Sequence, residues 1–317
     1  MQTVNEQVTD CAQSVIAQVR KVVVGKDSVL RWVLAAILAK GHILVEDIPG
    51  VGKTTMAVAF SKVLDLSYNR VQFTPDVLPS DVTGYSVLDQ ATGALQYKPG
   101  AVLCNLFLAD ELNRATSRTQ SALLEAMEEG QVTVDGVSHP IPKPFVVIAT
   151  QNPTGAAGTQ MLPDSQMDRF AIRISLGYPS PEDEEAMVMG RQGGDPMKAL
   201  VPLMTKEDLA AMQETVAKTY ISDLVVAYAV KLIDATRHHD KISRGASPRA
   251  TLSVVAVAKA LAQLQGRDYV VPKDVQEAFL KTVDHRLLLT TQAENSGIAP
   301  QSLLREILQQ VDAPKAG

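Results

Sequence analysis

Apolar residues recur along the first half of the chain in short runs separated by helical patterns. The runs of strand length are residues 43–45, 70–73, 102–109, 145–150 and 171–176. Strands that alternate with helices are typical of a parallel sheet with helices on its faces. Two further stretches, 85–97 and 131–141, alternate around the turn residues Asp89–Gly93 and Asp135-Gly136, which indicates β-hairpins. We therefore predict an α/β domain with two inserted hairpins.

A break in this pattern follows the last apolar run. The segment Gly177-Tyr178-Pro179-Ser180-Pro181 contains residues that interrupt regular structure. After it, apolar residues keep helical spacing to the end of the chain, at 181–190, 206–218, 222–238, 248–265, 272–288 and 301–310. We place a domain boundary here, with an α/β core over residues 1–178 and a smaller all-α domain over residues 179–317.

Composition narrows the class of protein. The chain has 317 residues, of which 46% are hydrophobic and 21% charged, as in an ordinary globular protein with two domains. A net charge of -5 argues against a protein that grips nucleic acid through a basic surface. Cys11 and Cys104 lie in apolar contexts and are expected to be free thiols. No secretory pattern opens the chain and the longest apolar run, Trp32–Ala39, is shorter than the ~20 residues of a membrane span, so we predict a cytoplasmic location.

A glycine-rich turn lies between the first predicted strand and the helix that follows it. The sequence from Asp47 to Thr54, DIPGVGKT, fits the pattern G-x-x-x-x-G-K-[ST] except that Asp47 replaces the first glycine. In such a loop the backbone amides contact phosphate oxygens, Lys53 reaches the β- and γ-phosphates, and the Thr54 hydroxyl binds Mg²⁺. We therefore predict a site for a nucleoside triphosphate, formed by Pro49, Gly50, Val51, Gly52, Lys53, Thr54 and Thr55.

Candidate catalytic residues follow two other predicted strands. Asp110 and Glu111 end the run that begins at Val102, and Asn152 follows the run that ends at Thr150. The carboxyl ends of parallel strands meet at one edge of a sheet, so these side chains are expected beside the phosphate loop. Asp110 would hold Mg²⁺, usually through water, Glu111 would polarise the attacking water, and Asn152 would orient it.

Two features near the loop have alternative explanations. The apolar hinge Val22-Val23-Val24-Gly25 precedes the loop, and either lies against the adenine ring, through Val24 and Gly25, or is a linker in the core. Arg114 and Arg118 follow the carboxylates, where they either contact phosphate or lie on a solvated helix face.

One arginine in the C-terminal half has an unusual position. Ser247-Pro248 begins a helix, and Arg249 lies in its first turn, where a positive charge opposes the helix dipole. A residue placed against local electrostatics is often there for a ligand. The histidines have no neighbours with metal-ligand spacing and are expected to be surface or core residues: His42, His139, His238, His239 and His285.

Together these motifs resemble the MoxR family of AAA+ ATPases. The matching segments are Pro49–Thr54, Leu108–Arg114, Ala149–Pro153, Asp168–Phe170 and Ser247–Arg249, with Gln72–Asp76, Leu78–Asp81 and Gln120–Glu129. The order and spacing match over essentially the whole chain. The resemblance implies an AAA+ P-loop domain followed by a helical lid, in a homo-oligomeric ring that is most often a hexamer.

The same resemblance implies a role for each motif. Lys53 and Thr54 match the Walker A pair, Asp110 and Glu111 the Walker B pair, and Asn152 sensor 1. Arg169 matches the arginine finger, which would act on the γ-phosphate of a neighbouring subunit; from the residues alone, a structural ion pair explains Arg169 equally well. Arg249 matches sensor 2, acting either on its own subunit or on a neighbour.

The family resemblance also implies partners and a function. Members are thought to be chaperone-like ATPases that remodel or mature protein clients such as metalloenzymes, often with a partner carrying a von Willebrand factor A domain. A nucleic-acid motor is the main alternative, because the two hairpins resemble insertions of the minichromosome maintenance branch. Their tips, Asp89–Gly93 and Asp135–Val137, carry no basic residue, which argues against it. A nucleotide-gated scaffold without turnover is a third possibility, against which the intact carboxylates argue.

Overall fold

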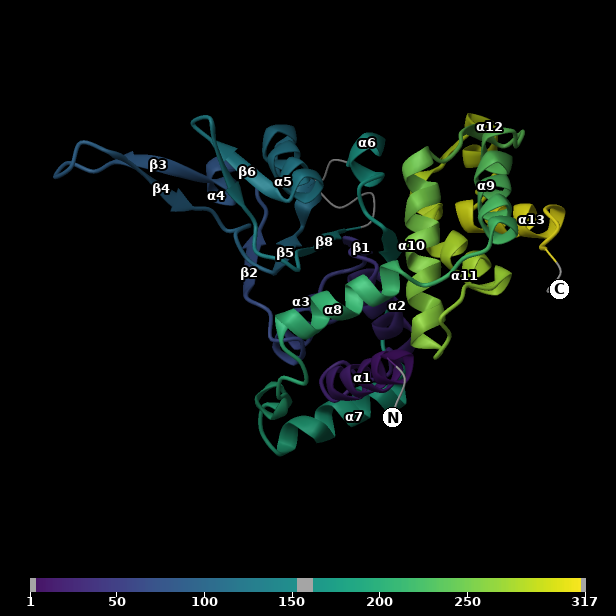
Figure 1. Cartoon of the computed structure of the whole chain (residues 1–317), viewed down its shortest axis with the longest axis horizontal. Helices are drawn as coiled ribbons and strands as arrows, with labels where there is room; N and C mark the ends of the chain where they lie inside the picture. Colours follow the sequence, from purple (N-terminus) through teal and green to yellow (C-terminus); the bar gives the residue numbers. More distant parts are fainter. Residues whose placement is uncertain (1–3, 153–161, 315–317) are drawn as a thin grey trace.

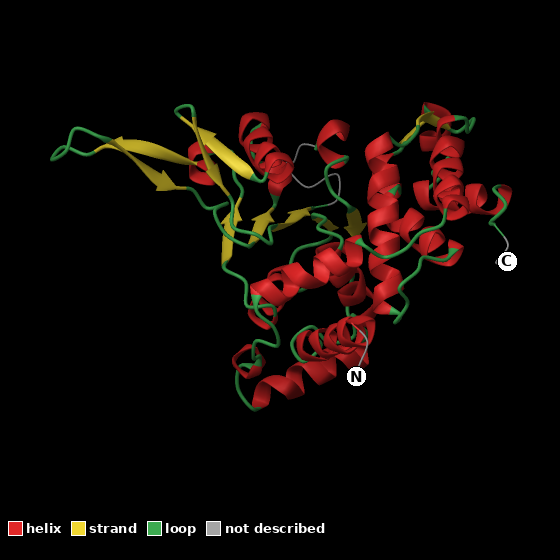
Figure 2. Cartoon of the chain, in the orientation of Figure 1, coloured by secondary structure: helices red, strands yellow, loops and turns green. Residues whose placement is uncertain are grey.

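A five-stranded parallel sheet forms the centre of the computed structural model, which describes residues 4–152 and 162–314. Its strand order is β2-β5-β8-β1-β9; Figure 2 shows the strands in yellow and the surrounding helices in red. The strands are β1 (Ile43–Glu46), β2 (Tyr68–Gln72), β5 (Leu106–Asp110), β8 (Val146–Gln151) and β9 (Ile172–Ile174). β1 pairs with β8 on one side and β9 on the other. The sheet therefore brings the ends of β1, β5 and β8 to one edge, as predicted.

Alternate residues of the strands pack into different apolar clusters. Ile43 and Val45 belong to a cluster with α1 (Val4–Val19), α2 (Asp27–Leu38) and α3 (Lys53–Val63), whereas Leu44 belongs to one with α4 (Pro79–Thr83) and α5 (Ser117–Glu129). Successive side chains of a strand point to opposite faces. Both faces of the sheet are therefore covered by helices, which explains why the strand sequences are continuous apolar runs.

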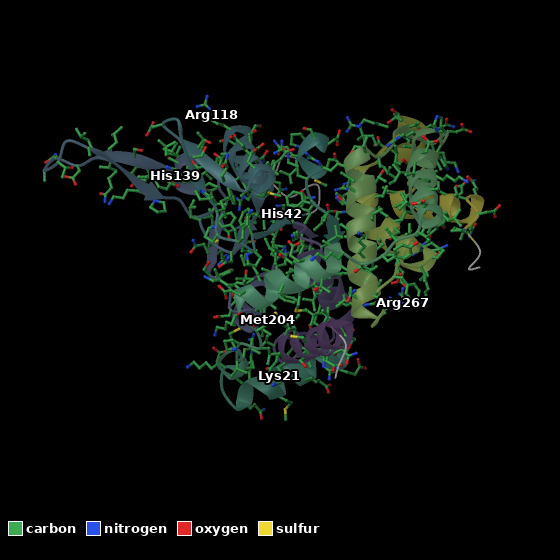
Figure 3. All side chains as sticks on the ribbon, viewed as in Figure 1. Lys21, His42, Arg118, His139, Met204 and Arg267 are labelled. Atoms are coloured by element: carbon green, nitrogen blue, oxygen red, sulfur yellow. The ribbon has the colours of Figure 1, made fainter. Side chains whose placement is uncertain are left out.

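Two hairpins extend from the side of the domain that lies away from the C-terminal helices (Figure 1). They are β3–β4 (Gly84–Leu88 and Leu95–Pro99) and β6–β7 (Gln131–Val134 and Val137–Pro140). The ring of His139, labelled in Figure 3, stacks on Tyr97 with the centroids 3.6 Å apart. This contact joins the two hairpins.

The C-terminal part is mainly helical. Its helices are α7 (Pro181–Gln192), α8 (Lys206–Ala217), α9 (Asp223–Arg237), α10 (Pro248–Leu264), α11 (Pro272–Thr282), α12 (Thr291–Asn295) and α13 (Pro300–Gln310), whereas the short α6 (Asp164–Met167) precedes β9 of the core sheet. Short 3-10 turns cover Leu112–Arg114, Pro196–Ala199 and Asp284–Arg286. None of these helices, nor any other in the described ranges, is long and apolar enough to cross a membrane.

Several element boundaries differ from the prediction. The expected strand 102–109 begins only at Leu106, and the expected loop 75–83 contains α4. The prediction of helix alone after residue 181 was wrong, because β10 (Ile242–Arg244) pairs with β11 (Leu288–Leu289). The expected helix 272–288 ends at Thr282, before β11. A three-residue strand carries too little periodicity to be separated from a helix by pattern.

The first helices after the predicted domain boundary pack back on the core. Gln213 on α8 donates a hydrogen bond to the carbonyl of Ile37 on α2 (2.7 Å), and the amide of Leu203 donates to the carbonyl of Val63 at the end of α3 (2.9 Å). The largest apolar cluster runs from the sheet through α2 into α8 and α10. Figure 1 shows α7 and α8 beside α1 to α3, and α9 to α13 grouped together, with α10 also packed against α1, α2 and α8.

Candidate active site

The phosphate loop joins β1 to α3 at the carboxyl end of the central strand. Gly50 and Gly52 have φ values of +86° and +97°, in a region that residues with a Cβ rarely adopt. A Cβ at either position would meet no atom within 4 Å, so the turn needs glycine for its backbone conformation and not for space. Gly52 caps α3, and the unpaired amides of the first turn of α3 therefore lie at the end of the loop.

Lys53 is buried inside this loop. Its Nζ donates to the carbonyls of Asp47 (2.7 Å) and Ile48 (3.1 Å). Burial lowers the pKa of Lys53, while the charges of Asp47, Asp110 and Glu111 oppose that shift. Hydrogen bonds between charged partners are stronger than bonds to neutral carbonyls, so a phosphate can replace these two partners.

Asp47, the departure from the general pattern, fastens the loop to the last strand. Its Oδ2 accepts hydrogen bonds from the amides of Leu176 (2.5 Å) and Gly177 (2.8 Å) and from the hydroxyl of Ser175 (3.1 Å). These three residues follow β9 and lead into α7. A glycine at position 47 would leave the amides without this acceptor.

Asp110 ends β5 beside the loop. Its two carboxylate oxygens accept hydrogen bonds from the hydroxyl of Thr150 (2.6 Å) and from Arg70 (2.7 Å). The hydroxyl of Thr54 has no hydrogen-bond partner among the residues that the structure describes. Carboxylate, hydroxyl and water oxygens are the ligands that Mg²⁺ prefers. The donor set fits Mg²⁺, which Asp110 would hold through water because both of its oxygens already accept hydrogen bonds.

Glu111 is held in an uncommon conformation next to Asn152. Its φ of +56° lies in the left-handed region that non-glycine residues rarely adopt. Arg114 donates to one carboxylate oxygen (2.7 Å) and Asn152 to the other (3.2 Å), and the pKa of Glu111 is lowered, chiefly by the Arg114 hydrogen bond. The Oδ1 of Asn152 is buried without a partner in the described part of the chain. An acceptor is thus left beside Glu111, suited to an ordered water.

A pocket of about 450 Å³ borders the phosphate loop. Its lining comprises Val22 to Val24 of the hinge, Pro49 to Gly52 and Thr55 at the phosphate loop, and Tyr178, Pro179 and residues of α7. Gly25 does not line this pocket. Its φ is +72°, and a Cβ at position 25 would collide with Asp183 of α7. The hinge therefore faces a cavity at the phosphate loop, and Gly25 allows α7 to approach it.

Arg169 and Arg249 lie together, away from this pocket. Both form an ion pair with one carboxylate, that of Glu128 near the end of α5, at 3.0 Å for Arg169. Arg169 also donates to the carbonyl of Leu124. The two arginines line a separate pocket of about 320 Å³ with Leu252. The structure thus groups the predicted site residues in two places: Lys53, Thr54, Asp110, Glu111 and Asn152 in one, Arg169 and Arg249 in the other.

The segment that carries Arg169 is fixed to the C-terminal helices. The Oγ of Ser247 donates to the carboxylate of Asp168 (2.8 Å), and Arg286 donates to the carbonyls of Asp168 (2.9 Å) and Phe170 (2.8 Å). Burial lowers the pKa of Arg286 to about 10, against the opposing charge of Asp168. The position of Arg169 therefore depends on α10 and the turn after α11.

Sequence reasoning missed several residues of the site. Arg70 and Thr150 hold Asp110, and Tyr178, assigned only to the domain boundary, lines the pocket. Arg114 contacts Glu111, a role outside both alternatives considered for it. Arg118 is exposed on α5 and makes no ion pair with the described residues (Figure 3). Pro153 of the sensor motif lies outside the described residues.

Comparisons with known proteins agree with this geometry. A family model described as "ATPase family associated with various cellular activities (AAA)" matches residues 42–172, and one described as "AAA lid domain" matches residues 234–307. A crystal structure from Cytophaga hutchinsonii, provisionally assigned as an ATPase, is 36% identical, with a TM-score of 0.90 over 98% of this chain and 97% of that one. A minichromosome maintenance homologue from Methanopyrus kandleri, 17% identical with a TM-score of 0.60 over 89% of this chain and 62% of that one, shares the fold. These matches confirm the predicted fold class of an AAA+ core with a helical lid.

Two of the relatives that cover nearly the whole chain are at least 40% identical to it. The uncharacterized protein YeaC of Bacillus subtilis is 43% identical over 94% of this chain and 93% of its own length. The chaperone MoxR1 of Mycobacterium tuberculosis is 40% identical over 95% of this chain and 81% of its own length. With this identity and both AAA matches, the chain belongs to the MoxR family of AAA+ ATPases and has a chaperone-like role.

Proposed function

We propose that this ATPase hydrolyses ATP with Mg²⁺ at a site shared between two copies of the chain in a closed ring, most simply a hexamer. One copy supplies Lys53, Asp110, Glu111 and Asn152, and the next supplies Arg169. The observation that carries the proposal is the position of Arg169, which lies with Glu128 and Leu252 and not on the wall of the nucleotide pocket.

The chemistry of the first copy follows from its hydrogen bonds. Mg²⁺, when bound by Thr54 and Asp110, neutralises charge on the phosphates. Lys53 exchanges the carbonyls of the loop for phosphate oxygens. Glu111, kept ionised by Arg114, accepts a hydrogen bond from the attacking water, and the free Oδ1 of Asn152 accepts a second one.

The second copy contributes positive charge. A guanidinium aimed at the γ-phosphate accelerates phosphoryl transfer by ~10³ to 10⁵-fold in related chemistry. Arg249 shares the carboxylate of Glu128 with Arg169, which favours action of both arginines on the neighbour's nucleotide. The contacts of Ser247 and Arg286 with Asp168 would transmit movement of the lid to Arg169.

The adenine ring is proposed to lie between the hinge and α7. Val22 to Val24 and Tyr178 give this pocket apolar and aromatic walls, as nucleotide bases require. Position 25 needs glycine because a Cβ there would collide with the side chain of Asp183.

We infer that hydrolysis remodels a protein client, together with a partner that carries a von Willebrand factor A domain, and that the protein is cytoplasmic. The hairpins support contact with a protein and not with nucleic acid. β3–β4 exposes Tyr85, Leu88 and Leu95, while the hairpin tips carry no basic residue.

The shared site is tested by two variants, each defective in a different half. Glu111→Gln and Arg169→Ala are each expected to lower the ATPase rate at least 100-fold, and Arg305→Ala, exposed on α13, serves as a control. Mixing the two defective variants brings an intact Glu111 of one copy next to an intact Arg169 of the other. Activity should therefore return in the mixture. A mixture that stays inactive while both variants assemble would refute the shared site.

A further inference from the structure

Helix α7 carries an apolar ridge that nothing in the described chain covers. None of its residues is buried. Val188 and Met189 are 64% and 62% exposed, and Glu185, one turn earlier, is exposed on the same side. Val188 also lines the rim of the nucleotide pocket. We call Glu185, Val188 and Met189 the α7 ridge.

An apolar groove lies on a different part of the surface, between α2, α8 and α10. Its volume is about 360 Å³ and its lining includes Val216, Leu252, Val255 and Ala256. Leu252 is 72% exposed. Leu252 and Ala256 also line the pocket that holds Arg169 and Arg249, so the groove is continuous with the position of the two arginines.

The charges at the two surfaces are opposite. The first turn of α7 carries Glu182, Asp183 and Glu184, and Glu185 follows. The groove is bordered by Lys40 and Lys259. Lys40 is paired with Glu214, whereas Lys259 donates to the carbonyl of Ala217 and has no carboxylate partner in the described ranges. An acidic helix with an apolar ridge therefore matches an apolar groove with a basic rim.

We propose that the groove binds the α7 ridge of a second copy of this chain, forming the outer part of the junction at which the ATP site is completed. This inference rests on the proposed shared site. When Arg169 and Arg249 of one copy reach the phosphate end of a neighbour's nucleotide, α10 continues from Arg249 to Lys259 over about 15 Å. That is of the order of the length of an extended nucleoside triphosphate, and Val188 of the α7 ridge lines the pocket proposed for its adenine ring.

The contact is heterologous, because the ridge and the groove are different surfaces of one chain. Each copy then offers a groove to one neighbour and a ridge to the other, which generates a ring when the rotation closes. A variant with a damaged ridge keeps its groove, and a variant with a damaged groove keeps its ridge.

The direct test places a charge on each surface. Met189→Glu and Leu252→Glu alter exposed helical positions, so each monomer should keep the circular dichroism spectrum and melting temperature of the parent. A buried, unpaired carboxylate disfavours association. Each variant should therefore need at least tenfold more protein to reach half-maximal ATPase rate and assembled mass. Leu224→Glu, at a position 68% exposed on α9, is the matched control and should assemble like the parent.

Mixing identifies the two surfaces as partners. Met189→Glu and Leu252→Glu chains together retain one undamaged junction, between the groove of the first and the ridge of the second. The mixture should form a heterodimer by native mass spectrometry, with ATPase activity from one site. Adding Arg169→Ala to the Met189→Glu chain should abolish that activity and leave the heterodimer intact.

The outcomes separate this inference from the shared site. In the first case, the parent assembles and its ATPase rate rises with concentration, but one of the single variants assembles like the parent. This result overturns the ridge-and-groove contact and leaves the shared site standing. Two defective variants that form no heterodimer also overturn the contact. A parent that stays monomeric and whose ATPase rate per chain is independent of concentration overturns the shared site itself.

Discussion

Replacing Asp47 by glycine would restore the first glycine of the general phosphate-loop pattern, and we predict that this change destabilises the protein. In the structure the carboxylate of Asp47 accepts hydrogen bonds from the amides of Leu176 and Gly177 and from Ser175. Leu176 is buried and Gly177 is half-buried. Asp47→Gly removes the acceptor and leaves these donors in place.

The size of the effect follows from the two amides. A buried donor that loses its partner costs ~1–3 kcal/mol. With about 2 kcal/mol for the amide of Leu176 and about 1 kcal/mol for that of Gly177, the free energy of unfolding should fall by about 3 kcal/mol. For a protein of 317 residues, that corresponds to a melting temperature lower by roughly 4–5 °C. Asp47→Asn keeps an oxygen acceptor and loses only the charge, so it should cost about 1 kcal/mol.

Calorimetric melting of the parent, both variants and Asp240→Gly would test this. Asp240 is exposed, so Asp240→Gly measures the cost of a new glycine without the loss of buried contacts. The order of stability should be parent, Asp240→Gly and Asp47→Asn close together, then Asp47→Gly. An Asp47→Gly variant that melts within 2 °C of Asp240→Gly would refute the reasoning.

Two predictions concern pH. Arg114→Ala removes the main cause of the lowered pKa of Glu111, so the pKa of Glu111 should rise. The acid limb of the ATPase pH profile should therefore move to higher pH. An acid limb that does not move would show that protonation of Glu111 does not limit the rate. His42 is half-buried and accepts a hydrogen bond at Nδ1 from the amide of Val147 (3.0 Å), and loss of solvent around the ring lowers its pKa from 6.5 to about 4. The unfolded chain therefore binds a proton first, and the free energy of unfolding should fall by up to about 3 kcal/mol as the pH drops from 6.5 to 4. Urea titrations at pH 7 and pH 5 should give a smaller difference for His42→Gln than for the parent; equal differences would contradict this.

A third prediction concerns the anchor of the arginine segment. Arg286→Met leaves the carbonyl of Asp168 without its donor and the Asp168 carboxylate without its ion pair, whereas the carbonyl of Phe170 keeps its contact with the His285 ring. Loss of one partner of a buried pair costs roughly 3–5 kcal/mol, measurable by urea unfolding. Arg267→Met breaks the ion pair between Arg267 and Asp274 of α11. It is a control for the loss of an arginine elsewhere in the lid. Only Arg286→Met should also reduce the ATPase rate of assembled protein.

Local sequence patterns were sufficient to predict the elements whose apolar or turn pattern extends over several residues. The apolar runs predicted the central sheet, and the turn residues Asp135-Gly136 predicted the second hairpin, because side-chain period and turn chemistry act between near neighbours. The pattern failed for β10 and β11, whose short strands exist through their pairing with each other. It also failed for the start of β5, since Val102, Cys104 and Asn105 are buried but do not belong to the strand.

The sequence by itself determined which residues form the phosphate loop and which carboxylates and amide lie at the ends of the neighbouring strands. Those motifs are contiguous, and their spacing encodes a strand, a turn and a helix. Only the tertiary structure decided that Asp47 binds the end of β9, that Arg114 holds Glu111, and that Arg169 and Arg249 meet at Glu128. These contacts join side chains brought together by the packing of separate elements, and no local periodicity records which elements will meet.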